Sequence, residues 1–189
     1  MKDGNLDESL SLCRSALTIF EETQNKVFLA GSWDNIGYLH YLKGDLLQSR
    51  RDLERTLELA RASGSAHMEA VALYNLGDTI AALGDGTEAI QRHREALTIR
   101  EKAGEKREVL ESRNAIAAID LDEGRVDEAI RAAVETANAA RAGRFVEPEL
   151  RARLVTARAL RSNRKLAEAA AELARASAIA ATAGDVEKL

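Results

Sequence analysis

A short signature recurs along this chain at a fixed interval of 40 residues. Its clearest copy is Leu83-Gly84-Asp85-Gly86-Thr87-Glu88-Ala89-Ile90, and the position of Gly84 is held in the other copies by Gly4, Gly44, Gly124 and Arg164. A gapless period of this size is typical of stacked supersecondary units, each of which buries its apolar face against its neighbours. The chain is therefore expected to fold as a repeat array rather than around one central core.

Each copy of the signature has the residues of a turn between two helices. The glycine suits the left-handed backbone that ends a helix, and the aspartate or asparagine after it can cap the next helix. A glutamate near the start of that helix favours the helix dipole and can close a capping box. The expected caps are Asn5, Asp45 and Asp85, and the expected glutamates are Glu8, Glu88, Glu128 and Glu168.

A second series of turn residues lies between the copies. Gly64, Gly104 and Gly184 are again separated by multiples of 40, while Gly143 is one residue early and Gln24 is at the first such position. Each repeat is therefore predicted to consist of two helices and two turns. The predicted helices cover residues 6–22, 26–42, 45–62, 66–83, 86–103, 106–123, 126–142, 148–162 and 165–183.

The composition supports a helical fold and limits the partners. Aromatic residues make up only 4% of the chain and proline occurs once, which argues against strands. The net charge of −4 comes from 27 basic and 31 acidic residues, a mixed surface with no general attraction to nucleic acid or an anionic membrane. A single cysteine, Cys13, excludes an internal disulfide framework and favours the cytoplasm. No run approaches the ~20 apolar residues of a membrane span.

We predict one all-α domain over residues 1–189. It is a right-handed superhelical solenoid of antiparallel helix pairs, with about nine helices in all. The predicted divisions are a half repeat at 1–24 and repeats at 25–64, 65–104, 105–144 and 145–184. The last full helix is apolar on most sides, as an interior helix would be, and the residues from Gly184 onward look like the start of another. We therefore expect a piece of a longer array.

Small residues and short motifs recur in register within the repeats. Small side chains let paired helices approach closely, and here Gly37, Gly77, Ala117 and Ala157 each precede a second small residue by 12 positions: Ser49, Ala89, Ala129 and Ala169. The triplets Asn35-Ile36-Gly37 and Asn75-Leu76-Gly77 stand just ahead of a Gly-Asp turn. Together these features resemble the long form of the tetratricopeptide repeat, found in kinesin light chains, G-protein-signalling modulators and bacterial multidomain regulators. The chain departs from that pattern in having no proline at the end of the second helix.

The resemblance implies that the first helix of each repeat lines a groove, along which an extended or helical peptide lies. It places Asn35 and Asn75 where groove asparagines bond a peptide backbone, whereas Ala115 and Val155 replace them in the later repeats. By helical spacing, further candidates share the neighbourhood of these asparagines. They are Asp34, Tyr38, Tyr41, Tyr74 and Asp78. For the tyrosines, a role in filling gaps between helices stays open.

Three arginines provide a second candidate surface. Arg151, Arg158 and Arg161 are separated by seven and three residues, so they fall on one helical stripe. The planar guanidinium can bind both oxygens of a carboxylate, which predicts an acidic partner segment or a free C-terminal carboxylate. The alternative is a solvated face, with the arginines paired to nearby glutamates.

The sequence contains no catalytic constellation. Its three histidines, His40, His67 and His93, lie in different repeats or on different helix faces and lack metal-ligand spacing. The Gly84-Asp85-Gly86-Thr87 segment lacks the Lys-Ser/Thr ending of a phosphate-binding loop, and there is no Gly-x-Ser-x-Gly motif. We therefore predict that the protein is not an enzyme and has no metal site and no cofactor.

The expected function is that of a protein-interaction scaffold that binds a peptide or partner protein in its groove. Two alternatives stay open. The array can be the regulatory or sensor part of a bacterial transcription regulator or signalling ATPase, or it can be a self-association element that uses exposed terminal helices. Nucleic acid and membranes are not expected partners.

Overall fold

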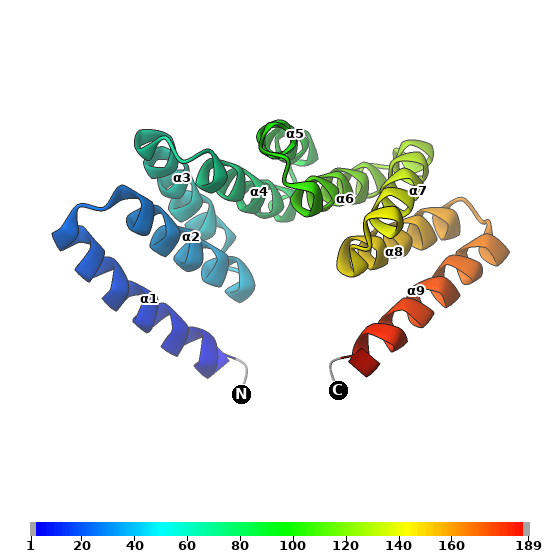
Figure 1. Cartoon of the computed structure of the whole chain (residues 1–189), viewed down its shortest axis with the longest axis horizontal. Helices are drawn as coiled ribbons and strands as arrows, with labels where there is room; N and C mark the ends of the chain where they lie inside the picture. The colour runs from blue at the N-terminus through cyan, green and yellow to red at the C-terminus, as the bar shows by residue number, and fades with distance from the viewer. Residues whose placement is uncertain (1–2, 187–189) are drawn as a thin grey trace. The chain divides into compact units, whose positions relative to one another are not determined.

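The computed structural model describes residues 3–186, and within them every regular element is an α-helix (Figure 1). The nine helices of this range agree with the predicted boundaries to within three residues. The first five are α1 Asp3–Thr23, α2 Lys26–Lys43, α3 Leu46–Ser63, α4 Ala66–Ala82 and α5 Gly86–Ala103. The other four are α6 Lys106–Asp122, α7 Val126–Gly143, α8 Val146–Ser162 and α9 Leu166–Val186. None of the described helices is both long and apolar enough to cross a membrane.

The helices form two compact units, one up to Ala103 and the other from Gly104. The first contains α1 to α5 and the second contains α6 to α9. Within each unit, helices that follow one another in the chain pack as neighbours, and α2 also packs on α4 and α6 on α8. The short turns make consecutive helices antiparallel. The single domain over residues 1–189 and its repeat limits stay predictions.

Left-handed backbone recurs every 20 residues and ends each helix except the last. Eight described residues have positive φ angles, between 54° and 93°, and five of them are glycines. Their amides bond back to the preceding turn: Gly44 N, for example, donates to Tyr41 O at 3.0 Å. The positions are Gln24, Gly44, Gly64, Gly84, Gly104, Gly124, Arg144 and Arg164. The predicted pattern of two turns in each repeat is therefore present.

Two of the glycines expected at turns belong to helices instead, Gly143 as the last residue of α7 and Gly184 within α9. α7 continues through Gly143, and Arg144 takes the left-handed conformation at the next position, with φ 60°. Glycine at residue 143 makes room for the Phe145 ring, because a Cβ there would lie 2.5 Å from Cε2 of Phe145. The turn predicted at Gly184 is wrong, since α9 continues through this residue to Val186. Glycine permits a left-handed turn but does not impose one.

One of the three expected helix caps forms the predicted hydrogen bond. Asp85 Oδ1 accepts from the amide of Glu88 at 2.9 Å. Asp45 occupies the cap position of α3, but its side chain makes no cap bond. Asn5 is not a cap, because α1 begins before it and the residue lies within the helix. The caps that the glycine signature did not indicate are Asn25 at α2 and Ser65 at α4.

Close helix contacts lie at the recurring small residues. A Cβ on Gly37 would be 2.8 Å from Leu53 Cγ, and a Cβ on Gly77 would be 2.7 Å from His93 Nε2. At the equivalent position of the second unit, Ala117 shares a core cluster with Ala133. Glycine is thus paired with a large side chain and alanine with a small one. The predicted close approach is confirmed, with a partner 16 residues further on rather than 12.

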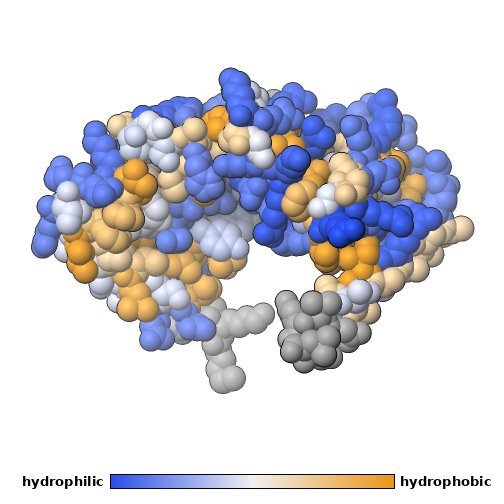
Figure 2. Space-filling view, in the orientation of Figure 1, coloured by the Kyte–Doolittle hydropathy of each residue, from blue (hydrophilic) through white to orange (hydrophobic). Residues whose placement is uncertain are grey.

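The cores of the two units differ in their side chains. In the first unit Leu10, Leu17 and Ile36 form an aliphatic cluster, against which the half-buried Cys13 packs. In the second unit the corresponding cluster combines the alanines Ala129 and Ala159 with Leu121. On the face that Figure 2 shows, hydrophobic residues gather over α1 and α2.

Candidate functional site

The exposed and half-exposed residues of α2 and α4 fall at matching repeat positions, and we call this surface the α2–α4 face. The two helices pack together within the first unit. The face consists of Asp34, Asn35, Tyr38, Tyr41 and Leu42 from α2 with Tyr74, Asn75, Asp78, Ala81 and Ala82 from α4. It brings together all five residues that were predicted to bind a peptide in this part of the chain. Their role in binding stays a prediction.

Asp34 and Asn75 link the two helices across this face. Asn75 Nδ2 donates to Asp34 Oδ1 at 2.9 Å. Burial raises the pKa of Asp34 above its ordinary value of 3.8, and the hydrogen bond from Asn75 opposes part of the rise. Among the described residues no lysine or arginine is paired with this carboxylate. When ionised, Asp34 therefore carries a partly desolvated charge that only an amide compensates.

Two tyrosines stack beside this pair, one helical turn along α2. The Tyr38 and Tyr41 rings have centroids 6.2 Å apart and an interplanar angle of 14°. Tyr38 is 48% exposed, which makes it more than a gap filler. Burial raises the pKa of Tyr41, and the nearby charges of Asp78 and Tyr38 raise it further. Asp78 of α4 therefore lies close enough to the tyrosine pair to act on it electrostatically.

Side chains of α5 support the face from behind. His93 is fully buried, and its Nε2 lies 3.3 Å from Asp78 Oδ1. Its ring meets Tyr74 edge-on with centroids 5.0 Å apart, and the Arg100 guanidinium lies 4.7 Å from the centre of the same tyrosine ring. His93 thus packs within the helix stack. The ring approaches Asp78 because Gly77 has no side chain and leaves room for it on α4. No local sequence motif indicates this contact.

The two predicted groove asparagines differ in what they can offer a ligand. Asn35 is exposed, and its amide makes no hydrogen bond with other residues of the described range. Asn75 is half-buried and already donates to Asp34. Asn35 therefore keeps its donors and acceptor available, whereas Asn75 positions a carboxylate.

The three predicted arginines lie on α8 in the second unit, and two of them have acidic partners there. Arg151 donates to Glu147 at 2.9 Å, and Arg158 donates to Asp122 at 2.9 Å. Burial of Glu147 opposes its ionisation, but Arg151 and Arg107 outweigh burial and lower its pKa. Arg161 is exposed and has no partner within residues 3–186. The solvated, paired arrangement thus accounts for two of the three.

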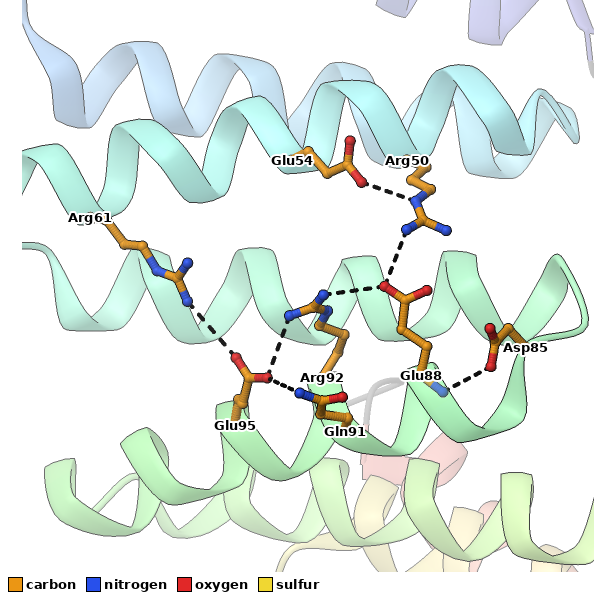
Figure 3. Close-up of polar contacts among 8 residues, drawn as sticks. All are labelled: Arg50, Glu54, Arg61, Asp85, Glu88, Gln91, Arg92 and Glu95. Carbon is orange, nitrogen blue, oxygen red and sulfur yellow. Dashed lines mark hydrogen bonds and ion pairs between the residues drawn. The ribbon is translucent and has the colours of Figure 1, made fainter.

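A network of alternating charges connects α3 with α5 (Figure 3). Arg50 donates to Glu54 at 2.9 Å and to Glu88 at 3.1 Å, and Glu88 also accepts from Arg92. Arg92 and Arg61 then share Glu95. The Glu88 side chain is directed into this network and does not close the predicted capping box. The charged side chains of this network are half-exposed or exposed, so each ion pair contributes little to stability.

The remaining histidine contacts are structural in character. His40 Nδ1 lies 2.6 Å from Asp52 Oδ2 in a buried pair, and Gln48 donates to the other oxygen. Beside His40 is an open, polar cleft of about 610 Å³ between α1 and α2. In the part of the chain that the structure describes, no three histidine, cysteine or acidic side chains gather as a metal site would require.

The fold and its faces define the class of the protein as a helical repeat protein built from antiparallel helix pairs. The tetratricopeptide repeat pattern matches residues 28–102 and 68–142, which together cover more than half of the chain. The chain belongs to the tetratricopeptide repeat family. No curated protein sequence is similar enough to the chain to count as a match.

Solved structures share this fold at low sequence identity. A variant of a candidate kinesin light chain from Podosopora anserina, with nearly identical TPR-like repeats, is 19% identical with a TM-score of 0.76, over 97% of this chain and 91% of that one. BtubC from P. vanneervenii is 18% identical with a TM-score of 0.82, over 97% and 76%. A Rap protein in complex with competence and sporulation factor is 18% identical with a TM-score of 0.74, over 96% and 60%. At these identities the likeness concerns the fold alone.

Proposed function

We propose that the protein is a non-catalytic interaction scaffold that binds a peptide or partner segment on the α2–α4 face. The observation that carries this proposal is the exposure, side by side, of Asn35 and Tyr38 on α2, which is packed against α4. A side-chain amide matches the hydrogen-bonding groups of a peptide backbone, and a rigid aromatic ring offers contact area at low entropic cost. The similar Rap protein was solved with a bound factor, which supports a binding role for the fold.

The second part of the proposal is that the partner carries acidic groups, and the arginines of the second unit support it. Arg161 is free to pair with a carboxylate, and an acidic segment can compete with Glu147 and Asp122 for the other two arginines. These contacts are exposed, so they contribute to the association rate and to specificity more than to affinity. A partner that bears acidic residues or a free C-terminal carboxylate fits the Arg151, Arg158 and Arg161 stripe.

A peptide display selection against the immobilised protein tests the proposal, followed by titration calorimetry on the selected peptides. Asn35→Ala removes the free amide and is expected to cost about 0.5–1.5 kcal/mol of binding free energy at any salt concentration. Arg161→Ala is expected to weaken binding of acidic peptides mostly at low salt, because exposed charges are screened over about 10 Å at 0.1 M. The exposed Asp45→Asn change is the matched control. Peptides that bind all variants as they bind the parent would contradict the proposal.

Self-association is a second candidate, which the surface of α1 favours. Leu12 is 66% exposed and Ile19 is 60% exposed on this helix. Such exposure of large apolar side chains on one terminal helix suits contact with another protein surface. Light scattering across a range of concentrations tests it, and a constant monomeric mass would exclude it. A regulatory or sensor role within a larger bacterial protein is a third candidate, and the full sequence of the protein that contains this chain would test it.

A further inference from the structure

The α2–α4 face is acidic, and none of its own residues carries a positive charge that would neutralise the carboxylates. It contains the carboxylates of Asp34 and Asp78 and no lysine or arginine. Two basic side chains of α5, His93 and Arg100, approach from behind, and both are buried. A ligand that reaches this face from solvent therefore meets acidic and aromatic groups, while the basic groups lie beneath them.

The contacts place these acidic and aromatic groups in one small area. Asp34 is bonded to Asn75, which precedes Asp78 by less than one turn of α4. Asp78 acts electrostatically on Tyr41, and Tyr41 stacks on Tyr38, one turn from Asp34. These relationships connect the acidic and aromatic side chains of α2 with those of α4. A side chain that contacts the exposed ring of Tyr38 is one helical turn from the Asp34 carboxylate.

The arrangement has the chemistry of a site for a cation. The negative face of a tyrosine ring attracts an ammonium or guanidinium group, and the attraction increases where the site is partly desolvated. Asp34 has no basic partner among the described residues, and Asp78 has only the buried His93 near it, whose Nε2 lies 3.3 Å from Oδ1 without a hydrogen bond. The site therefore offers unneutralised charge together with an aromatic surface. Both favour a basic side chain and disfavour an acidic one.

We propose that the Asp34–Tyr38–Tyr41–Asp78 site binds a lysine or arginine side chain of the peptide held on the α2–α4 face. Arginine is the preferred occupant, because its planar guanidinium can stack on Tyr38 and direct its donors to a carboxylate at the same time. The proposal rests on the proposed function, since the cation belongs to a peptide on the same surface. It gives the first unit a basic ligand, whereas the arginines of the second unit suit an acidic one.

Three short peptides test the site directly. Acetyl-Gly-Arg-Gly-amide is titrated into the whole chain and followed by the backbone amide resonances of residues 34–42 and 74–82. The citrulline peptide is a neutral isostere of the same shape, and the glutamate peptide reverses the charge. We expect the arginine peptide to bind at least about fivefold more tightly than the citrulline peptide, and the glutamate peptide to leave these resonances unmoved. Equal binding of the arginine and citrulline peptides overturns the proposal.

Substitutions locate the site. Asp78→Asn and Tyr38→Ala are each expected to weaken binding of the arginine peptide at least about threefold. Asp45→Asn removes the same charge at an exposed position away from the α2–α4 face and is expected to have no effect. Unchanged melting temperatures show that the variants are folded. If Asp45→Asn weakens binding as much as Asp78→Asn, the effect reflects net charge alone and the site is wrong.

The outcomes separate this inference from the proposed function. If selected peptides bind the α2–α4 face without enrichment in lysine or arginine, and the arginine peptide does not bind, the scaffold function is upheld and the cation site is rejected. The arginine peptide can also bind as described while the selection yields no peptide of greater length that binds this face. In that case the cation site is upheld and the scaffold function is rejected.

Discussion

Gly77 lies so close to His93 that a Cβ at residue 77 would be 2.7 Å from the Nε2 atom and 2.8 Å from Cδ2 of the histidine. The missing side chain is what allows the His93 ring to pack against α4 and reach Asp78. The equivalent residues one repeat earlier, Gly37 and Leu53, show the same relationship. Close packing of Gly77 and His93 therefore brings the His93 ring next to Asp78, a residue of the α2–α4 face.

Gly77→Ala should destabilise the first unit. Its Cβ would overlap the His93 ring, and overpacking of this kind costs about 1–3 kcal/mol. In a His93→Ala background the cost should largely disappear, because the pair then matches the Ala117–Ala133 pair of the second unit. Urea denaturation of the four proteins of this cycle measures the coupling.

Gly31→Ala is the matched control for this prediction. Gly31 is inside α2, but a Cβ there would meet nothing within 4 Å. Alanine favours the helix over glycine, so this change should stabilise the protein by about 0.5–1 kcal/mol. If Gly77→Ala also stabilises, the close contact with His93 is not a constraint on the fold.

The repeat period was enough to predict which helices exist and where they turn, but not how side chains meet across them. Small residues at positions 77 and 89 predicted a close approach between their helices. The contact at Gly77 involves His93, one helical turn beyond Ala89, because the direction in which a side chain leaves its helix decides the partner. Sequence spacing alone does not carry that direction.

The candidate site shows the same limit. Asn35 and Asn75 occupy equivalent positions, so the period predicts equivalent roles for them. In the structure Asn75 is bonded to Asp34, which belongs to the neighbouring position of the previous repeat. A bond between non-equivalent positions depends on the offset between packed helices, which a repeat pattern does not determine. The arginines of α8 show both cases: Arg151 pairs with Glu147 one turn earlier in the same helix, as sequence spacing allows, whereas the partner of Arg158, Asp122, comes from α6 and is set by packing within the second unit.

Arg144→Gly should stabilise the second unit. Arg144 adopts a left-handed conformation with φ 60°, which costs a residue with a side chain roughly 1–2 kcal/mol relative to glycine. The glycines at equivalent turns, such as Gly64 and Gly104, avoid this cost. We expect a higher midpoint of thermal unfolding, with Gly104→Ala as the reciprocal variant that lowers it. A lower midpoint for Arg144→Gly would show that its side chain has a stabilising contact that outweighs the strain.

Arg153 should be far more important for stability than the arginines on the surface. Its buried guanidinium donates to Glu149 at 2.6 Å and to Glu172 at 2.9 Å, and so connects α8 with α9. Arg153→Met leaves the half-buried Glu149 without its partner and Glu172 with Arg175 alone, and should cost about 3 kcal/mol in the free energy of unfolding.

Arg50→Met provides the comparison for Arg153, because it breaks two ion pairs of a side chain that is 36% exposed. This variant should lose less than about 1 kcal/mol. Urea denaturation compares the two variants, and hydrogen exchange of α9 should increase in Arg153→Met alone. Equal losses would mean that burial does not distinguish the two sites.

Asp34→Asn should stabilise the first unit at neutral pH, and the gain should shrink as the solution is acidified. Burial raises the pKa of Asp34 in the folded protein above its ordinary value of 3.8, so folding favours the protonated carboxyl. The stability that this preference contributes is fully present below about pH 3.8 and is lost as the pH rises through the folded-state pKa. Asparagine cannot ionise and keeps an oxygen for the hydrogen bond from Asn75, so it avoids that loss.

Unfolding free energies of the Asp34→Asn variant and the parent, measured from pH 3 to pH 7, should diverge as the pH rises. Asp45→Asn is the control for the loss of one negative charge. A variant that is less stable than its parent at pH 7 would show that the charge of Asp34 is compensated in the folded protein, and the site would then have no unneutralised carboxylate to offer a cation.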